Sequence, residues 1–120
     1  MYQKLLTKDI IKRMPLDVEN AENAPVIVKF FGGGSYRLYV IAAHAHLESG
    51  EEVKLSDING KPVEDIHYYG YVTGLQYDEW GSTSDNELRA LKFPPFGLSI
   101  ERDMHLGKIT VKQVIAKEVY

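Results

Sequence analysis

The 120-residue sequence contains no cysteine. This absence excludes a disulfide scaffold, a cysteine-ligated zinc ribbon and a thiol nucleophile, and it is typical of proteins from a reducing compartment. The sequence also lacks an apolar run long enough to span a bilayer, and its first fifteen residues lack the apolar core of a signal peptide. We therefore expect a cytoplasmic protein without a membrane segment.

The net charge is small, −3 at pH 7, and it is unevenly distributed. Residues 47–66, the acidic arm, carry six acidic residues against two lysines, whereas the rest of the chain is nearly neutral. A nearly neutral body offers no broad surface for phosphate groups, so nucleic-acid binding is not predicted. We expect the acidic arm to project from the domain as solvated surface.

Three N-cap signals predict three short helices. Thr7 precedes an apolar pattern that Pro15 ends, Ser84 and Glu87 form a capping box, and Thr110 precedes the last helical pattern. Runs rich in β-branched and aromatic residues predict strands between these helices. The predicted strands cover residues 26–31, 36–46, 66–76 and 96–102.

Two turn signals connect the predicted strands. Gly32–Ser35 lies between two strand patterns and predicts a hairpin loop; a phosphate-binding loop would need a helix after it. Asn59-Gly60 in the acidic arm predicts a second hairpin, with Val53–Leu55 before it and Pro62–Val63 after it.

These elements predict one α+β domain covering residues 1–120. Short links between consecutive strands favour antiparallel pairing. We expect an antiparallel sheet of four to five strands, with about three short helices packed mainly on one face. An exposed edge strand in such a sheet would allow a homodimer.

Four segments resemble a known family when they are taken in order. They are residues 5–8 (LLTK), 25–31 (PVIVKFF), 70–74 (GYVTG) and 97–103 (GLSIERD). Together they are similar to the family called domain of unknown function 2958, and the last segment is close to that family's Gly-Leu-x-Ile-Glu-Arg-Asp signature. The likeness extends over residues 4 to about 115.

This resemblance implies an accessory protein of bacterial plasmids and integrated mobile elements, and it implies no particular activity. The sequence departs from the family pattern in two places. The acidic arm is longer than expected, and Thr83 stands where the family often has an aromatic residue. A site near the arm would therefore be particular to this protein.

His44, His46 and His67 are the candidate metal ligands. Residues two apart in a strand share a face, so His44 and His46 point the same way. If the arm projects, His46 lies opposite His67, His44 opposite Tyr69, and Ala42 opposite Tyr71. Three imidazoles with an open fourth position form a catalytic zinc arrangement. The alternative is that these side chains only cover a solvated sheet face.

The opposite face of the same strands is expected to form the core. It would carry Tyr39, Ile41, Ala43 and Ala45 on one strand. Lys29 lies in a run of bulky apolar residues, and either it is partly buried or its stem packs while its amine reaches water.

Glu101, Arg102 and Asp103 are candidate binding residues. Glu101 and Asp103 share a strand face, so their carboxylates suit acid–base chemistry or a hard cation such as magnesium. The alternative is a set of structural ion pairs, which produce the same pattern.

Tyr69, Tyr71 and Trp80 are candidate contacts for a protein partner, because tyrosine and tryptophan are common anchors at interfaces. Base stacking would need a basic groove that the composition does not predict.

No nucleophile constellation is present, so no catalytic residue is assigned. The leading hypothesis is a non-enzymatic accessory protein that binds another macromolecule, which we expect to be a protein, without a cofactor. The alternative is a small enzyme dependent on a divalent metal at the three histidines.

Overall fold

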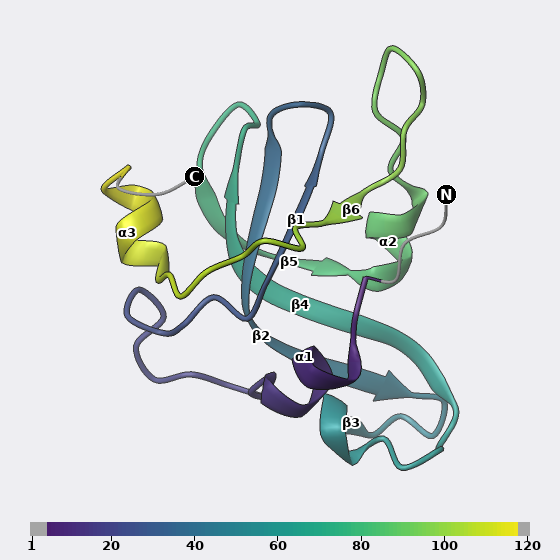
Figure 1. Ribbon diagram of the computed structural model, residues 1–120. Helices are drawn as coiled ribbons and strands as arrows, with labels where there is room; N and C mark the ends of the chain where they lie inside the picture. The colour runs from purple at the N-terminus through teal and green to yellow at the C-terminus, as the bar shows by residue number, and fades with distance from the viewer. Residues whose placement is uncertain (1–4, 118–120) are drawn as a thin grey trace.

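The computed structural model describes residues 5–117. Six strands form one antiparallel sheet in the order β5-β4-β2-β1-β6, and β3 also pairs with β2 (Figure 1). The elements are α1 (Lys8–Arg13), β1 (Val28–Gly32), β2 (Tyr36–Leu47), β3 (Glu52–Lys54), the 3-10 helix η1 (Leu55–Asp57), β4 (Val63–Thr73), β5 (Glu79–Ser84), α2 (Asp85–Ala90), β6 (Glu101–Arg102) and α3 (Val111–Ile115). The predicted α+β fold, with an antiparallel sheet and three short helices, is confirmed.

All three predicted N-caps are confirmed. The Thr7 hydroxyl accepts a hydrogen bond from the Ile10 N–H at 3.2 Å, and Ser84 caps α2 in the same way at 3.1 Å. Thr110 begins α3 with a capping box that includes Gln113. No helix among residues 5–117 is long and apolar enough to cross a membrane.

A β-bulge at Ile41 divides β2 into two halves. Val40 lies opposite Gly70 and Ala42 lies opposite Tyr69, so one extra residue stands in β2 between them. An extra residue reverses the alternation of side chains along a strand. The prediction that Tyr39, Ile41, Ala43 and Ala45 share one face is therefore wrong. Tyr39 and Ile41 pack in one core, and Ala43 and Ala45 pack in the other.

The sheet consequently buries apolar side chains on both faces. The larger core receives Ile10 of α1, Leu88 of α2 and Leu55 of η1. The smaller core receives Val111 and Val114 of α3, together with residues of the segment that precedes β1. Two of the three helices thus cover one face and the third covers part of the other.

The acidic arm folds back against the sheet through its first half. Asn59 and Gly60 have φ angles of 49° and 75°, which confirms the predicted turn. The predicted pairing is wrong, however, because residues 52–54 pair with residues 44–46 of β2. Leu55, which follows, is only 2% exposed in the larger core. Burial of the Leu55 side chain holds the first half of the arm against the sheet. A hairpin that paired residues 53–55 with residues 62–63 would not allow this position.

The last strands differ from their predicted ranges. Strand β5 was not predicted, since its sequence EWGSTS is rich in glycine and serine. Of the predicted strand 96–102, only Glu101 and Arg102 pair with β1. Residues 93–98 instead form a separate turn, closed by two hydrogen bonds between Phe93 and Leu98 at 2.9 and 3.1 Å.

A substitution at Gly70 tests the close backbone contact between β4 and β2 beside the bulge. A Cβ at this position would overlap the carbonyl oxygen of Tyr39, whereas a Cβ on its cross-strand partner Gly81 would meet nothing. We expect Gly70→Ala to lower the free energy of unfolding by about 1–3 kcal/mol, because backbone must move to admit the methyl group. Gly81→Ala, the matched control, should leave it unchanged or slightly raised. Urea denaturation measures both, and equal effects of the two substitutions would contradict this account.

Candidate functional site

The three histidines lie on one face of the sheet, as predicted, but in a different register. His44 lies opposite His67, and His46 lies opposite Asp65. The predicted pairings of His46 with His67, His44 with Tyr69 and Ala42 with Tyr71 are therefore wrong by two residues. Because the side-chain period of a strand is two, this shift leaves the three imidazoles on a common face. We call His44, His46 and His67 the histidine cluster.

The imidazoles of the histidine cluster contact one another and nearby carboxylates. The rings of His44 and His67 stack with centroids 5.1 Å apart, and the ring of His46 lies edge-on to His67 at 6.3 Å. The Nε2 atom of His44 lies 3.7 Å from Glu52, and that of His46 lies 3.5 Å from Glu64. These nitrogens are thus directed at different acids.

No group of three or more histidine, aspartate or glutamate side chains in residues 5–117 is arranged to hold a metal ion. Metal binding by the histidine cluster stays a prediction that requires the rings to turn away from their carboxylates. Stoichiometric metal in untagged protein, lost on His46→Ala, would support it.

Asp65, opposite His46, is engaged with α2. Burial acts to raise the pKa of its carboxyl, but hydrogen bonds from the backbone N–H groups of Ile66 at 2.8 Å and Asn86 at 3.1 Å outweigh burial and lower that pKa. The Ser84 hydroxyl and the nearby His67 act in the same direction. The carboxylate therefore joins β4 to the first turn of α2.

The aromatic candidates are partly structural. Tyr71 lies edge-on to Trp80 with centroids 5.3 Å apart, and both pack against the smaller core. Tyr69 stacks beside Trp80 at 5.8 Å and is more exposed. Of the three, Tyr69 is the one best placed to contact a partner.

The segment Glu101–Asp103 divides into surface and structural positions. Glu101 is exposed at the edge of the sheet. Asp103 forms an ion pair with Lys29 at 3.5 Å, and the Lys29 side chain is only 7% exposed. The Lys29 ammonium also lies 5.3 Å from the centroid of the Tyr39 ring. The interpretation that Lys29 is buried is therefore confirmed, rather than the one in which its amine reaches water. Asp103 is the structural partner of Lys29.

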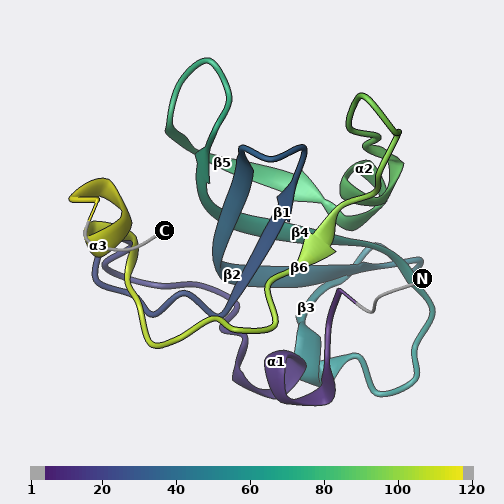
Figure 2. The same cartoon turned by 45° about the horizontal axis from the view of Figure 1, so that its top comes forward.

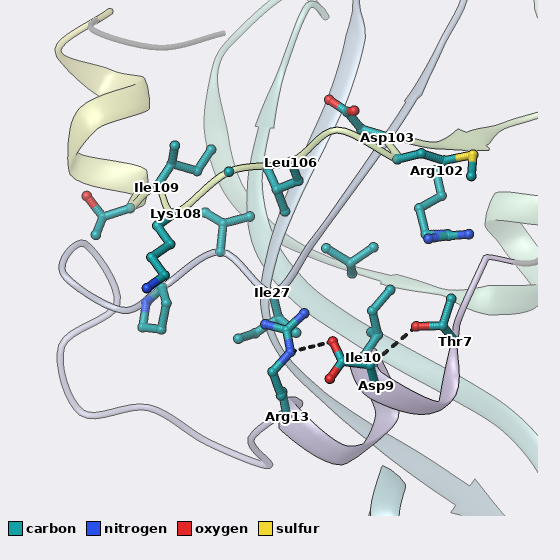
Figure 3. Close-up of a pocket in the computed structure, with 16 residues that line it drawn as sticks. Thr7, Asp9, Ile10, Arg13, Ile27, Arg102, Asp103, Leu106, Lys108 and Ile109 are labelled. Carbon is teal, nitrogen blue, oxygen red and sulfur yellow. Dashed lines mark hydrogen bonds and ion pairs between the residues drawn. The ribbon is translucent and has the colours of Figure 1, made fainter.

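Arg102 and Asp103 also line a groove of about 740 Å³ between α1 and the segment that follows β6 (Figure 3). This volume is typical of ligand sites. Apolar side chains of α1 and β1 lie at the bottom of the groove, and charged side chains stand around them. We call it the β1 groove. Its other walls include Met104, Leu106 and residues 107–110, none of which was among the predicted site residues.

Three loops lie at the end of β1 that is away from the β1 groove. They rise from the same end of the sheet in both views (Figures 1 and 2). They are the β1–β2 turn, the β4–β5 loop and the turn formed by residues 93–98. The Ser35 hydroxyl donates to the Gly74 carbonyl at 3.2 Å, which joins the first two. A side chain at Gly32 would overlap the Phe93 ring, so the third loop packs closely against the first.

This end of the sheet exposes four large apolar side chains, which we call the apolar loop end. They are Leu75 at 60%, Tyr77 at 69%, Phe96 at 82% and Leu98 at 60% exposure. None was among the predicted site residues. Pro94-Pro95-Phe96-Gly97 carries a turn signal that could have identified Phe96 as a loop tip rather than the start of a strand.

Comparison of the chain with protein-family models, curated proteins and solved structures finds no match. The resemblance to domain of unknown function 2958 therefore stays an expectation.

The lowered pKa of Asp65 leads to a pH-dependent prediction. A carboxyl whose pKa is lower in the folded than in the unfolded chain stabilises the fold above its unfolded pKa, about 3.9, and this stabilisation is lost as pH falls through the folded value. Asp65→Asn should therefore reduce the urea midpoint at pH 7, and the difference from wild type should shrink below about pH 4. Glu48→Gln, at an exposed carboxyl of the arm, is the control. A difference that stays constant from pH 7 to pH 2.5 would contradict this role of Asp65.

Proposed function

We propose that this chain is a non-enzymatic accessory protein that binds another protein through the apolar loop end. The resemblance noted above supports a setting in the cytoplasm of a bacterium that carries a mobile element. The single observation that carries the proposal is the exposure of Phe96, Leu98, Leu75 and Tyr77 on loops at one end of the sheet.

The apolar loop end has the properties of a contact surface. Large apolar side chains gathered at one place on a surface favour association, because their removal from water stabilises a complex by roughly 25 cal/mol per Å². Phe96 stands at the tip of a turn closed by the Phe93–Leu98 hydrogen bonds, and Phe93 packs 5.8 Å from the Tyr36 ring. Such support lowers the entropy lost when a side chain is ordered in an interface.

The charges near these loops favour a protein over a nucleic acid. The three loops carry one charged side chain, Asp78, and Arg37 and Lys92 stand next to them in the chain. Phosphate binding depends on clustered lysine and arginine, and the described residues of the three loops themselves include neither. An apolar pocket on a partner protein is the better complement.

A capture experiment tests this function. Phe96→Ser and Tyr77→Ser should each abolish capture of the partner from a bacterial lysate, because they remove apolar area from the contact. Both should leave the free energy of unfolding within about 0.5 kcal/mol of wild type, since the side chains are exposed. Leu16→Ser, at an exposed leucine outside the three loops, is the matched control and should retain the partner.

Photo-crosslinking locates the contact directly. Benzoylphenylalanine at position 96 should crosslink the captured protein, and the same group at position 16 should not. A partner that binds Phe96→Ser as well as wild type, or a lysate that yields no stable partner, would overturn the proposed function. Crosslinking between two copies of the chain would instead show that the partner is a second copy and that the complex is a homodimer.

A further inference from the structure

Strand β5 ends the sheet and leaves one of its edges without a strand. It has six residues and, among residues 5–117, pairs with no strand other than β4. The other outer strands offer less edge, because β3 has three residues and β6 has two. The edge of β1 is occupied by β6 and, further along, by the hydrogen bond from the Val26 N–H to the Ile109 carbonyl. Strand β5 is therefore the longest open edge of the described sheet.

Strand β5 also lacks the features that usually protect an edge strand, which are lysine, proline, a bulge or a covering segment. Its sequence, EWGSTS, contains neither lysine nor proline, and its register with β4 is continuous from residue 79 to residue 84. Glu79, its first residue, is its only charge. Ser82 is exposed, and a Cβ at Gly81 would meet nothing within 4 Å. Such an edge is open to pairing with a further strand.

The pairing of the inner strands shows which backbone groups of β5 point outward. The Ile27 N–H donates to the Val40 carbonyl at 2.9 Å, so Val40 directs its groups toward β1. Successive residues of an antiparallel strand direct their N–H and C=O to opposite edges. Tyr39 therefore faces its β4 partner Tyr71, and Tyr71 faces away from its β5 partner Trp80. The N–H and C=O of Trp80, and those of the residue two positions later, thus point away from the sheet.

These outward groups are complementary to a second copy of the same strand. In an antiparallel pair centred on Gly81, Trp80 lies opposite Ser82 of the second copy, and Ser82 lies opposite its Trp80. Each of these two pairs exchanges two hydrogen bonds, about four in all. Glu79 then faces Thr83 of the second copy, so no like charges meet. A parallel pair in register would instead place the two Glu79 side chains together.

We propose that two copies of this chain pair antiparallel through β5, about a two-fold axis at Gly81, and so form one continuous sheet. A contact of this kind uses the same surface of both copies. A strand pair of this length buries less than the roughly 1,200 Å² of a standard interface, so we expect a weak, concentration-dependent dimer. The dimer uses none of the four side chains of the apolar loop end. It therefore goes beyond the proposed function and does not depend on it.

Sedimentation equilibrium on the intact chain tests the pairing, at concentrations up to about 1 mM, where weak affinities are measurable. Wild type should dimerise. Ser82→Pro should raise the Kd by about tenfold or more, because it removes one outward N–H donor from each copy. The same N–H does not bond to β4, so this variant should keep the circular dichroism spectrum of wild type. Ser82→Ala, the matched control, keeps the N–H and should dimerise as wild type does.

Disulfide formation tests the register, since the chain has no cysteine of its own. Residues that face each other without exchanging hydrogen bonds have Cα atoms about 4.5 Å apart, which suits a disulfide. Gly81→Cys should therefore crosslink two copies under a mild oxidant such as diamide. Ser82→Cys is the control, because diagonal neighbours lie about 7–8 Å apart. We expect Gly81→Cys to crosslink at least about tenfold faster.

Phe96→Ser should leave the Kd of the dimer unchanged, which distinguishes failure of this interface from failure of the loop end. A wild-type chain that stays monomeric up to about 1 mM, or an equal Kd for Ser82→Pro, would overturn the proposal. Crosslinking of Ser82→Cys as fast as that of Gly81→Cys would overturn it as well. Capture of another protein by a monomeric chain, lost in Ser82→Pro, would assign the β5 edge to a different partner and would also count against the dimer.

Discussion

The pairing of β2 along both of its edges is the constraint on which the rest of the structure depends. One edge pairs with β4, while the other pairs with β1 through residues 36–40 and with β3 through residues 44–46. The bulge at Ile41 stands between these two partners. Because a bulge reverses the alternation of side chains, Val40 and Ala43 enter the larger core, while Ile41 and Ala42 enter the smaller one.

The bulge also separates the covered and the open parts of one sheet face. Before it, Tyr39 is buried in the smaller core, to which α3 contributes. After it, His44 and His46 are partly exposed on that face. The histidine cluster therefore occupies a stretch of sheet outside that core, where its rings lie against one another and two of them lie near carboxylates.

Features set by a few neighbouring residues could be predicted from the sequence. Thr7, Ser84 and Thr110 cap their helices because the N-cap hydrogen bond joins residues three apart. The glycine turn after Phe31 is equally local. The histidine cluster was predicted for a different reason: the strand period of two keeps His44, His46 and His67 on one face even when the register moves by two residues.

Features set by distant segments could not be predicted in the same way. Strand β5 has a weak strand sequence and forms because β4 offers it an edge through residues 67–72. The acidic arm follows the burial of Leu55, and a single leucine in a polar segment does not reveal where it packs. The apolar loop end has exposed side chains at positions 75 and 77 and at positions 96 and 98, and only the fold places these loops at the same end of the sheet.

The Lys29–Asp103 pair links the core to the β1 groove. Lys29 is buried on β1 beside the Tyr39 ring, so its ammonium requires a nearby negative partner, and Asp103 provides one. The same carboxyl accepts a hydrogen bond from the His105 N–H at 2.8 Å, which turns the chain immediately after β6. A chain turned at this point cannot continue along the edge of β1, and it returns to that edge only at Ile109. The buried charge thus accounts for both the short length of β6 and the open groove beside β1.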